Sequence, residues 1–242
     1  MSKPEFNPFN PEFRAHPYSF YDELRLHEPV HTTEFGMVVL TRYDDVSTTL
    51  KSADFSRDIE KYSTQATSES RQRRREMQRE RTKSILNLDP PDHTRLRRIV
   101  SKSFTPSAME KLRGRIEQLV NTVLDTAQER GSIELIDDLA FPVPFQVISD
   151  LLAMPTERAE EMREWSQIIT NSLEPTATDE ELAQSDDAVA QLVPYLTSII
   201  EDRRKHLGDD MLSSLITAEE AGDKMTTDEL MAFLVLLYIA GH

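Results

Sequence analysis

Apolar residues recur at helical spacing along most of the chain, and this pattern predicts a mainly helical protein. A helix from Thr105 to Gly131 is opened by proline and keeps one apolar stripe. Amphipathic helices are expected over Glu157–Leu173 and Glu180–His206. The proline-opened segment FPVPFQVISDLLAMP lies between Gly131 and these two helices, and it is predicted to be a largely buried helix that ends near Pro155.

A small β-sheet is expected near the amino terminus. β-branched and apolar residues at Val30–Thr33 and Gly36–Thr41 flank a Phe-Gly turn, and a short helix is expected over Tyr43–Lys51. No internal repeat or low-complexity linker interrupts the chain. The predicted fold class is therefore mainly α with a small β-sheet, in a single domain over residues 1–242.

The last segment predicts a helix that belongs inside a larger protein. Thr226 and Glu229 have the spacing of a capping box, and every residue in Leu230–Gly241 is apolar or small. A helix that is hydrophobic all round is normally buried, and this one is shorter than the roughly 20 residues that cross a bilayer. Gly241 is either an ordinary C-cap at a domain end or a residue within a longer helix. We favour the second interpretation, which makes the domain incomplete.

Charge and composition exclude several classes of function. Lys+Arg 28 against Asp+Glu 43 gives a net charge of −15, which argues against nucleic acid as a partner. The amino terminus lacks the basic-then-apolar pattern of a signal peptide, so a cytoplasmic protein without a membrane anchor is expected. The absence of cysteine removes disulfides, thiolate metal sites and cysteine nucleophiles.

A basic segment stands out within this acidic chain. Between Arg57 and Lys102 there are 13 Lys and Arg against 7 Asp and Glu. The run RQRRREMQRER, Arg71–Arg81, is typical of a solvated helix or mobile loop, and the functional alternative is a lid or docking segment.

The stretch LNLDPPDHTRLRRIV, residues 86–100, carries the main candidate chemistry. Pro90-Pro91 fixes extended backbone, Asp92 is a suitable N-cap, and a helix is expected from His93 to about Phe104. Its buried face is predicted to contain Leu96, Ile99, Val100 and Phe104.

Two sets of basic residues on this helix are expected to face different surroundings. His93 and Arg97 lie four residues apart beside the apolar face and need an anion, either a carboxylate of this protein or one from a ligand. Arg95, Arg98 and Lys102 are predicted to point the opposite way, into solvent.

Several separated motifs resemble those of one enzyme family. DPPDHTRLRRIVSKSFTP resembles the C-helix motif of bacterial cytochrome P450 enzymes, and LVLLYIAGH resembles the centre of their long distal helix. HPYSFYDELR, FPVPFQVISDLLAMP and DDMLSSLITAEEAGDKMTTDEL follow the same order as in that family. The resemblance implies a cytochrome P450-like fold, present as its N-terminal portion and truncated within the distal helix.

The resemblance also implies a cofactor and its contacts. The cofactor is haem b (iron protoporphyrin IX), whose propionates would be bound by His93 and Arg97, while Ala240 and Gly241 would lie over the ring. The residues expected at the haem are His93, Arg97, Phe104, Ala240 and Gly241.

Substrate and partner surfaces follow from the same resemblance. Residues 165–180 would form a roof over a hydrophobic substrate, and for Leu236 and Ile239 plain core packing is the alternative. The residues expected to touch substrate are Ile85, Leu86, Leu236, Ile239 and Ala240. The residues expected to face a ferredoxin or flavodoxin-type electron donor, itself reduced by an NAD(P)H reductase, are Arg95, Arg98 and Lys102, with simple solvated charge as the alternative.

The chain also departs from the family pattern. The acid and threonine of the family's distal helix would follow His242, and the Glu-x-x-Arg structural pair and axial cysteine that come later in the family's sequence are missing here. We therefore expect no catalytic residue and no metal ligand in these 242 residues, and no activity from this chain alone.

The leading hypothesis is a haem-dependent monooxygenase that inserts one oxygen atom from O2 into a hydrophobic organic substrate, by hydroxylation or epoxidation. One alternative is a truncated, non-catalytic relative that acts as a binding or interaction module. Another is an unrelated helical ligand-binding protein whose motif matches are accidental.

Overall fold

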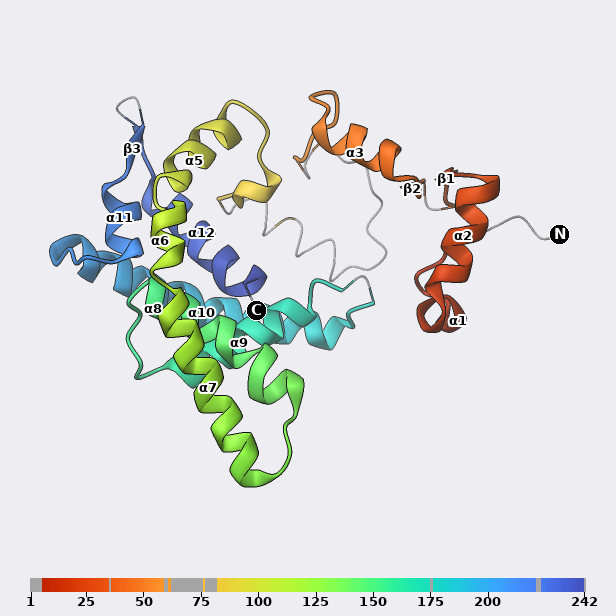
Figure 1. Cartoon of the computed structure of the whole chain (residues 1–242). Helices are drawn as coiled ribbons and strands as arrows, with labels where there is room; N and C mark the ends of the chain where they lie inside the picture. Colours follow the sequence, from red (N-terminus) through yellow and green to blue (C-terminus); the bar gives the residue numbers. More distant parts are fainter. Residues whose placement is uncertain are drawn as a thin grey trace. The chain divides into compact units, whose positions relative to one another are not determined.

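Helices make up most of the secondary structure in both parts of the chain (Figure 1). The computed structural model describes residues 6–34, 36–58, 61, 76, 82–174, 176–220 and 223–241. It divides the chain into two units, residues 1–56 and 57–242.

The first unit combines three short helices with one hairpin. The hairpin strands are antiparallel, with His31 opposite Val39, and Gly36 in the connecting turn has a φ of +76° that favours glycine. The predicted strands are confirmed, although both are shorter than expected. The elements are α1 (Pro11–Ala15), α2 (Pro17–His27), β1 (Val30–Thr32), β2 (Val38–Leu40) and α3 (Tyr43–Lys51).

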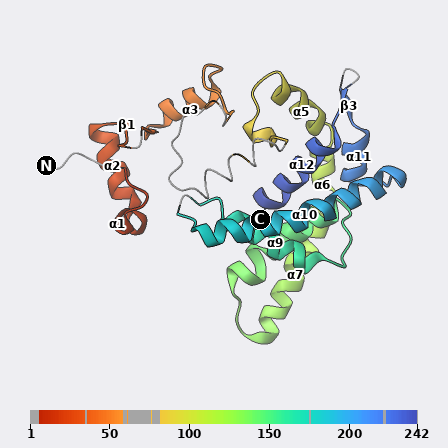
Figure 2. The ribbon, with the colours of Figure 1, turned by 180° about the vertical axis from the view of Figure 1, so that it is seen from behind.

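The second unit contains the longer helices and the main hydrophobic core. Figures 1 and 2, seen from opposite sides, both show α12 beside α10. Its elements are the 3₁₀ turn η2 (Ile85–Asn87), α5 (Asp92–Ser101), α6 (Pro106–Glu110), α7 (Arg113–Arg130), the π-helical segment η3 (Leu135–Ala140), α8 (Pro142–Leu151), α9 (Ala159–Asn171), α10 (Asp179–Lys205), α11 (Met211–Thr217), β3 (Glu219–Glu220), β4 (Asp223–Lys224) and α12 (Thr227–Ala240).

The helix predicted over Thr105–Gly131 is in fact two helices. The first ends at Glu110 and the second begins at Arg113. Gly114, in the first turn of the second helix, has low helix propensity, which favours a break at this position. The predicted stop is confirmed, because Gly131 caps α7 in the left-handed conformation.

The apolar helix α12 is fixed at a junction of three other helices. It contacts α8, α9 and α10, and Leu230, Leu234 and Tyr238 have no exposed surface. The Tyr238 hydroxyl shares a 3.3 Å hydrogen bond with Ser149 of α8, and the Ser166 hydroxyl of α9 donates to the Tyr238 carbonyl at 3.4 Å. The predicted capping box is confirmed at Thr226 and Glu229.

The helices α9 and α10 pack side by side and are joined by polar contacts as well as by apolar ones. The hydroxyl of Ser172 donates to that of Ser185 at 2.9 Å, and both side chains are buried. The guanidinium of Arg158 lies 4.7 Å from the ring centroid of Trp165 and 4.9 Å from that of Tyr195. The predicted roof, residues 165–180, consists of the end of α9, the connection that follows it and the start of α10.

Within the described part of the chain, no helix combines the length and apolar character needed to span a bilayer.

Candidate active site

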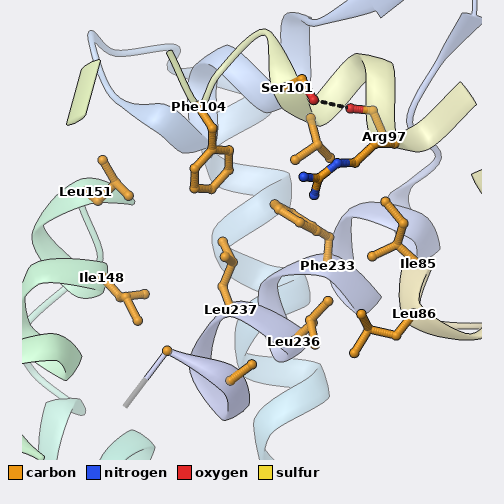
Figure 3. A pocket seen from close by; sticks show the side chains of 13 residues that line it. Ile85, Leu86, Arg97, Ser101, Phe104, Ile148, Leu151, Phe233, Leu236 and Leu237 are labelled. Atoms are coloured by element: carbon orange, nitrogen blue, oxygen red, sulfur yellow. Dashed lines mark hydrogen bonds between the residues drawn. The ribbon is translucent and has the colours of Figure 1, made fainter. Parts of the chain in front are cut away.

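A pocket of about 570 Å³ lies within the second unit, between η2, α5, α8 and α12 (Figure 3). Apart from the side chains of Arg97 and Ser101, its lining consists of apolar side chains and glycine. The lining residues are Ile85, Leu86, Arg97, Val100, Ser101, Phe104, Ile148, Leu151, Phe233, Leu236, Leu237, Ala240 and Gly241.

Helix α12 supplies one wall of the pocket because of its residue spacing. Phe233, Leu236, Leu237, Ala240 and Gly241 are spaced so that they share one face of a helix. The neighbouring face carries Leu230, Leu234 and Tyr238, which have no exposed surface and belong to the core. The all-round apolar pattern thus results from two different surroundings, a packed core on one side and a pocket on the other.

Gly241, at the end of α12, packs tightly against α8 in the pocket wall. A Cβ atom built on Gly241 would overlap Cδ1 of Ile148, which also lines the pocket. The lack of a side chain therefore permits the close packing of the two walls.

Helix α5 supplies another wall and, among the residues that the structure describes, the only charged group in the lining. The guanidinium of Arg97 points into the pocket, toward the rings of Phe104 and Phe233 (Figure 3). Ser101, one turn later, donates its hydroxyl to the Arg97 carbonyl at 2.6 Å. Arg97 has no carboxylate partner among the described residues, so the sequence-based alternative of an internal carboxylate finds no support there.

The 3₁₀ turn η2 is attached on both sides to the segment that begins the second unit. Lys83 Nζ lies 2.8 Å from Asp58, and Lys61 Nζ lies 2.8 Å from Asp89. The hydrogen bond that Lys61 donates to the Asp89 carboxylate raises the pKa of Lys61. These pairs hold the turn that presents Ile85 and Leu86 to the pocket. Most of Arg71–Arg81 lies outside the described residues.

Most of the predicted site residues meet at this pocket. Those that line it are Ile85, Leu86, Arg97, Phe104, Leu236, Ala240 and Gly241. His93 does not line it, although it lies one turn before Arg97 with a half-buried side chain.

Ile239 does not line the pocket either, and it packs against the core cluster instead. The sequence-based expectation put it on the same face as Leu236. Leu236 already lies at one edge of the pocket-facing stripe, and the further rotation of about 60° between residues three apart places Ile239 outside it. The alternative of core packing is the one that the structure supports for Ile239.

The predicted orientation of Arg95 is also wrong. Its guanidinium pairs with the carboxylate of Glu229, and the two side chains are only 25% and 15% exposed. The first turn of α12 places this carboxylate beside α5, so the arginine has a protein partner instead of facing solvent. Arg98 and Lys102 are exposed, as predicted.

Six lining residues were missed by sequence reasoning. Helical spacing from Leu236 could have identified Phe233 and Leu237 on the same helix. It cannot identify lining residues that come from another helix. Ser101 is likewise spaced one turn from Arg97, and Val100, which was predicted only for the buried face of its helix, also lines the pocket. Ile148 and Leu151 belong to α8, and only the tertiary packing of α8 beside α12 brings them to the pocket.

The described residues contain no group of three or more His, Asp or Glu side chains able to hold a metal ion. The pocket is instead suited to an apolar molecule that carries an anionic group, because apolar walls surround one inward-pointing cation. The fold and the geometry thus define a binding site for an apolar molecule with an anionic group.

Comparison with known proteins identifies the family. Residues 14–242 match the sequence profile of the family described as Cytochrome P450. The chain is 36% identical to cytochrome P450 107B1 of Saccharopolyspora erythraea, covering 99% of this chain and 58% of that protein. It is 34% identical to a cytochrome P450 of Bacillus subtilis, with coverage of 95% and 56%.

Solved structures agree with the sequence comparison. The cytochrome P450 PksS of the Bacillus subtilis bacillaene polyketide synthase superposes with a TM-score of 0.82 at 32% identity, covering 98% of this chain and 58% of that one. The chain belongs to the cytochrome P450 family, and the predicted fold class is confirmed. It spans less than two thirds of the length of these relatives, which agrees with the prediction of an N-terminal portion.

Proposed function

We propose that the protein to which this chain belongs is a haem-dependent monooxygenase. It would insert one oxygen atom from O2 into a hydrophobic organic substrate, in the cytoplasm, with electrons from a separate donor. Membership of the cytochrome P450 family supports this reaction class.

The observation that carries the proposal is the guanidinium of Arg97, an exposed residue that lines the apolar pocket and points its charge into it. Haem b is a flat apolar ring with two propionate groups, so it matches both the walls and the cation. A charge-assisted hydrogen bond from Arg97 to a propionate would satisfy a cation that has no carboxylate partner among the described residues. When bound, the haem supplies the activation of O2.

The other pocket residues have roles that follow from their positions. We assign His93, one turn before Arg97, to the propionates as well, and Phe104, Ala240 and Gly241 to contact with the ring. Ile85, Leu86 and Leu236, together with Ala240, would contact the substrate. Their surfaces favour a hydrophobic molecule, because nothing in the lining besides Arg97 and the Ser101 hydroxyl offers a polar side chain.

The chain would provide only part of the complete site. None of its 242 residues is cysteine, so the axial thiolate typical of the family does not come from this sequence. This chain would supply the propionate contacts and one substrate wall, while the rest of such a domain supplies the thiolate.

The electron donor would bind outside the pocket. Arg98 and Lys102 are exposed on α5, on a surface suited to an acidic ferredoxin or flavodoxin-type protein that is reduced by an NAD(P)H reductase. Arg95 is excluded from this surface because it pairs with Glu229.

Isotope labelling tests the reaction. The full-length protein would be incubated under ¹⁸O2 with NADPH, a surrogate ferredoxin and its reductase, and a panel of hydrophobic steroids, macrolides and fatty acids. The expected product carries one labelled oxygen atom and forms only when both NADPH and O2 are present. A product labelled from water, or a haem-loaded protein that oxidises nothing in the panel, would count against the proposal.

A further inference from the structure

The carboxylate of Glu229 makes contacts in two directions. One oxygen, Oε1, accepts a hydrogen bond from the Arg95 guanidinium of α5. The other, Oε2, accepts from the backbone N–H of Thr226 at 2.9 Å and so closes the capping box of α12. One side chain therefore caps the first turn of α12 and binds α5.

The ion pair between Arg95 and Glu229 is partly shielded from solvent, so it can help to fix the position of α5 against α12. The side chains of Arg95 and Glu229 are 25% and 15% exposed, so solvent screens their attraction less than it would on an open surface. By contrast, the Arg113 to Glu110 pair between α6 and α7 is 66% and 65% exposed. The chain thus offers a matched exposed pair for comparison.

The same two helices form facing walls of the pocket. Just after the end of α5, the ring of Phe104 meets that of Phe233 of α12 edge to face, with centroids 6.1 Å apart. Arg97 lies two residues after Arg95 on α5, and its side chain points into the pocket that α12 lines (Figure 3). Any shift of α5 against α12 would therefore move the Arg97 guanidinium relative to the opposite wall.

We propose that Arg95 and Glu229 form a positioning pair which fixes α5 against α12 and thereby holds Arg97 in the orientation that binds a haem propionate. This inference rests on the proposed function. Arg95 does not touch the pocket, and it acts through Arg97.

The test compares haem loss in the haem-loaded full-length protein. The rate of haem transfer to excess apomyoglobin is measured for the wild type, Arg95→Met, Arg95→Lys and Arg113→Met. From the size of coupling energies between residues in one network, we expect Arg95→Met to speed haem loss about threefold to tenfold. Arg95→Lys, which keeps the charge, should recover part of this effect, and Arg113→Met should leave the rate unchanged.

A second background separates positioning from a general loss of stability. In an Arg97→Met protein, where the propionate contact is already gone, Arg95→Met should change the rate by less than about twofold, because a residue that acts through Arg97 then has no contact left to position. An equal effect in both backgrounds, or none in either, would overturn the positioning role. A full-length protein that retains no haem would instead overturn the proposed function, and the positioning role with it.

Discussion

The packing of α8 against the end of α12 depends on the missing side chain of one residue, Gly241. Gly241 has no side chain where Cδ1 of Ile148 fills the space, while a Cβ added to Gly114 on α7 would meet nothing within 4 Å. The two glycines therefore predict opposite responses to the same substitution.

Gly241→Ala is expected to destabilise the full-length protein by about 1 to 3 kcal/mol, the usual cost of overpacking. Gly114→Ala should be neutral or stabilising by up to about 1 kcal/mol, since it only reduces the entropy of the unfolded chain. Denaturant unfolding followed by circular dichroism measures both effects.

The double variant Gly241→Ala with Ile148→Val removes the overlap with Cδ1 of Ile148, while the carbonyl oxygen of Leu237, 2.6 Å from the added Cβ, stays in place. Its destabilisation should be smaller than the sum of the two single effects. Strict additivity would show that the contact between these residues is not the cause.

At the scale of elements, α12 depends on its first turn. The Thr226 hydroxyl accepts from the Glu229 N–H at 3.1 Å, and the Glu229 carboxylate accepts in return from the Thr226 N–H. The helix that begins here carries both the core contacts and one pocket wall, so its cap influences the core and the pocket together.

Thr226→Ala should cost about 0.5 to 2 kcal/mol of unfolding free energy, because one backbone N–H loses its acceptor. Thr227→Ala removes the neighbouring hydroxyl, which is not the one that forms the cap, and it should cost less. Equal losses in the two variants, measured by chemical denaturation, would contradict the role assigned to the cap.

Local patterns predicted the parts of the fold that local chemistry decides. The Thr226 cap, the Gly131 stop and the long apolar helix were all visible as short-range spacing. The division of one predicted helix into α6 and α7 was not, since the apolar stripe continues across the break. The hairpin of β3 and β4 was missed as well, because two-residue charged strands carry no alternation to recognise.

At the scale of the whole molecule, the second unit brings sequence-distant segments to one pocket. Residues 85–104, 148–151 and 233–241 line it together. Motif order indicated the first and the last of these through the family resemblance. The sequence predicted the helix α8 but not its place in the pocket, because that depends on tertiary packing against α12. Likewise, only the fold shows that Glu229 reaches Arg95.

The central claim is that the inward-pointing cation of this pocket holds haem, and haem retention by Arg97→Met in the full-length protein tests it most directly. Loss of a charge-assisted hydrogen bond predicts haem transfer to apomyoglobin about 10 to 100 times faster than in the wild type. Arg113→Met, which removes an arginine from an exposed ion pair on α7, should retain haem like the wild type. Equal rates for Arg97→Met and Arg113→Met would contradict the claim.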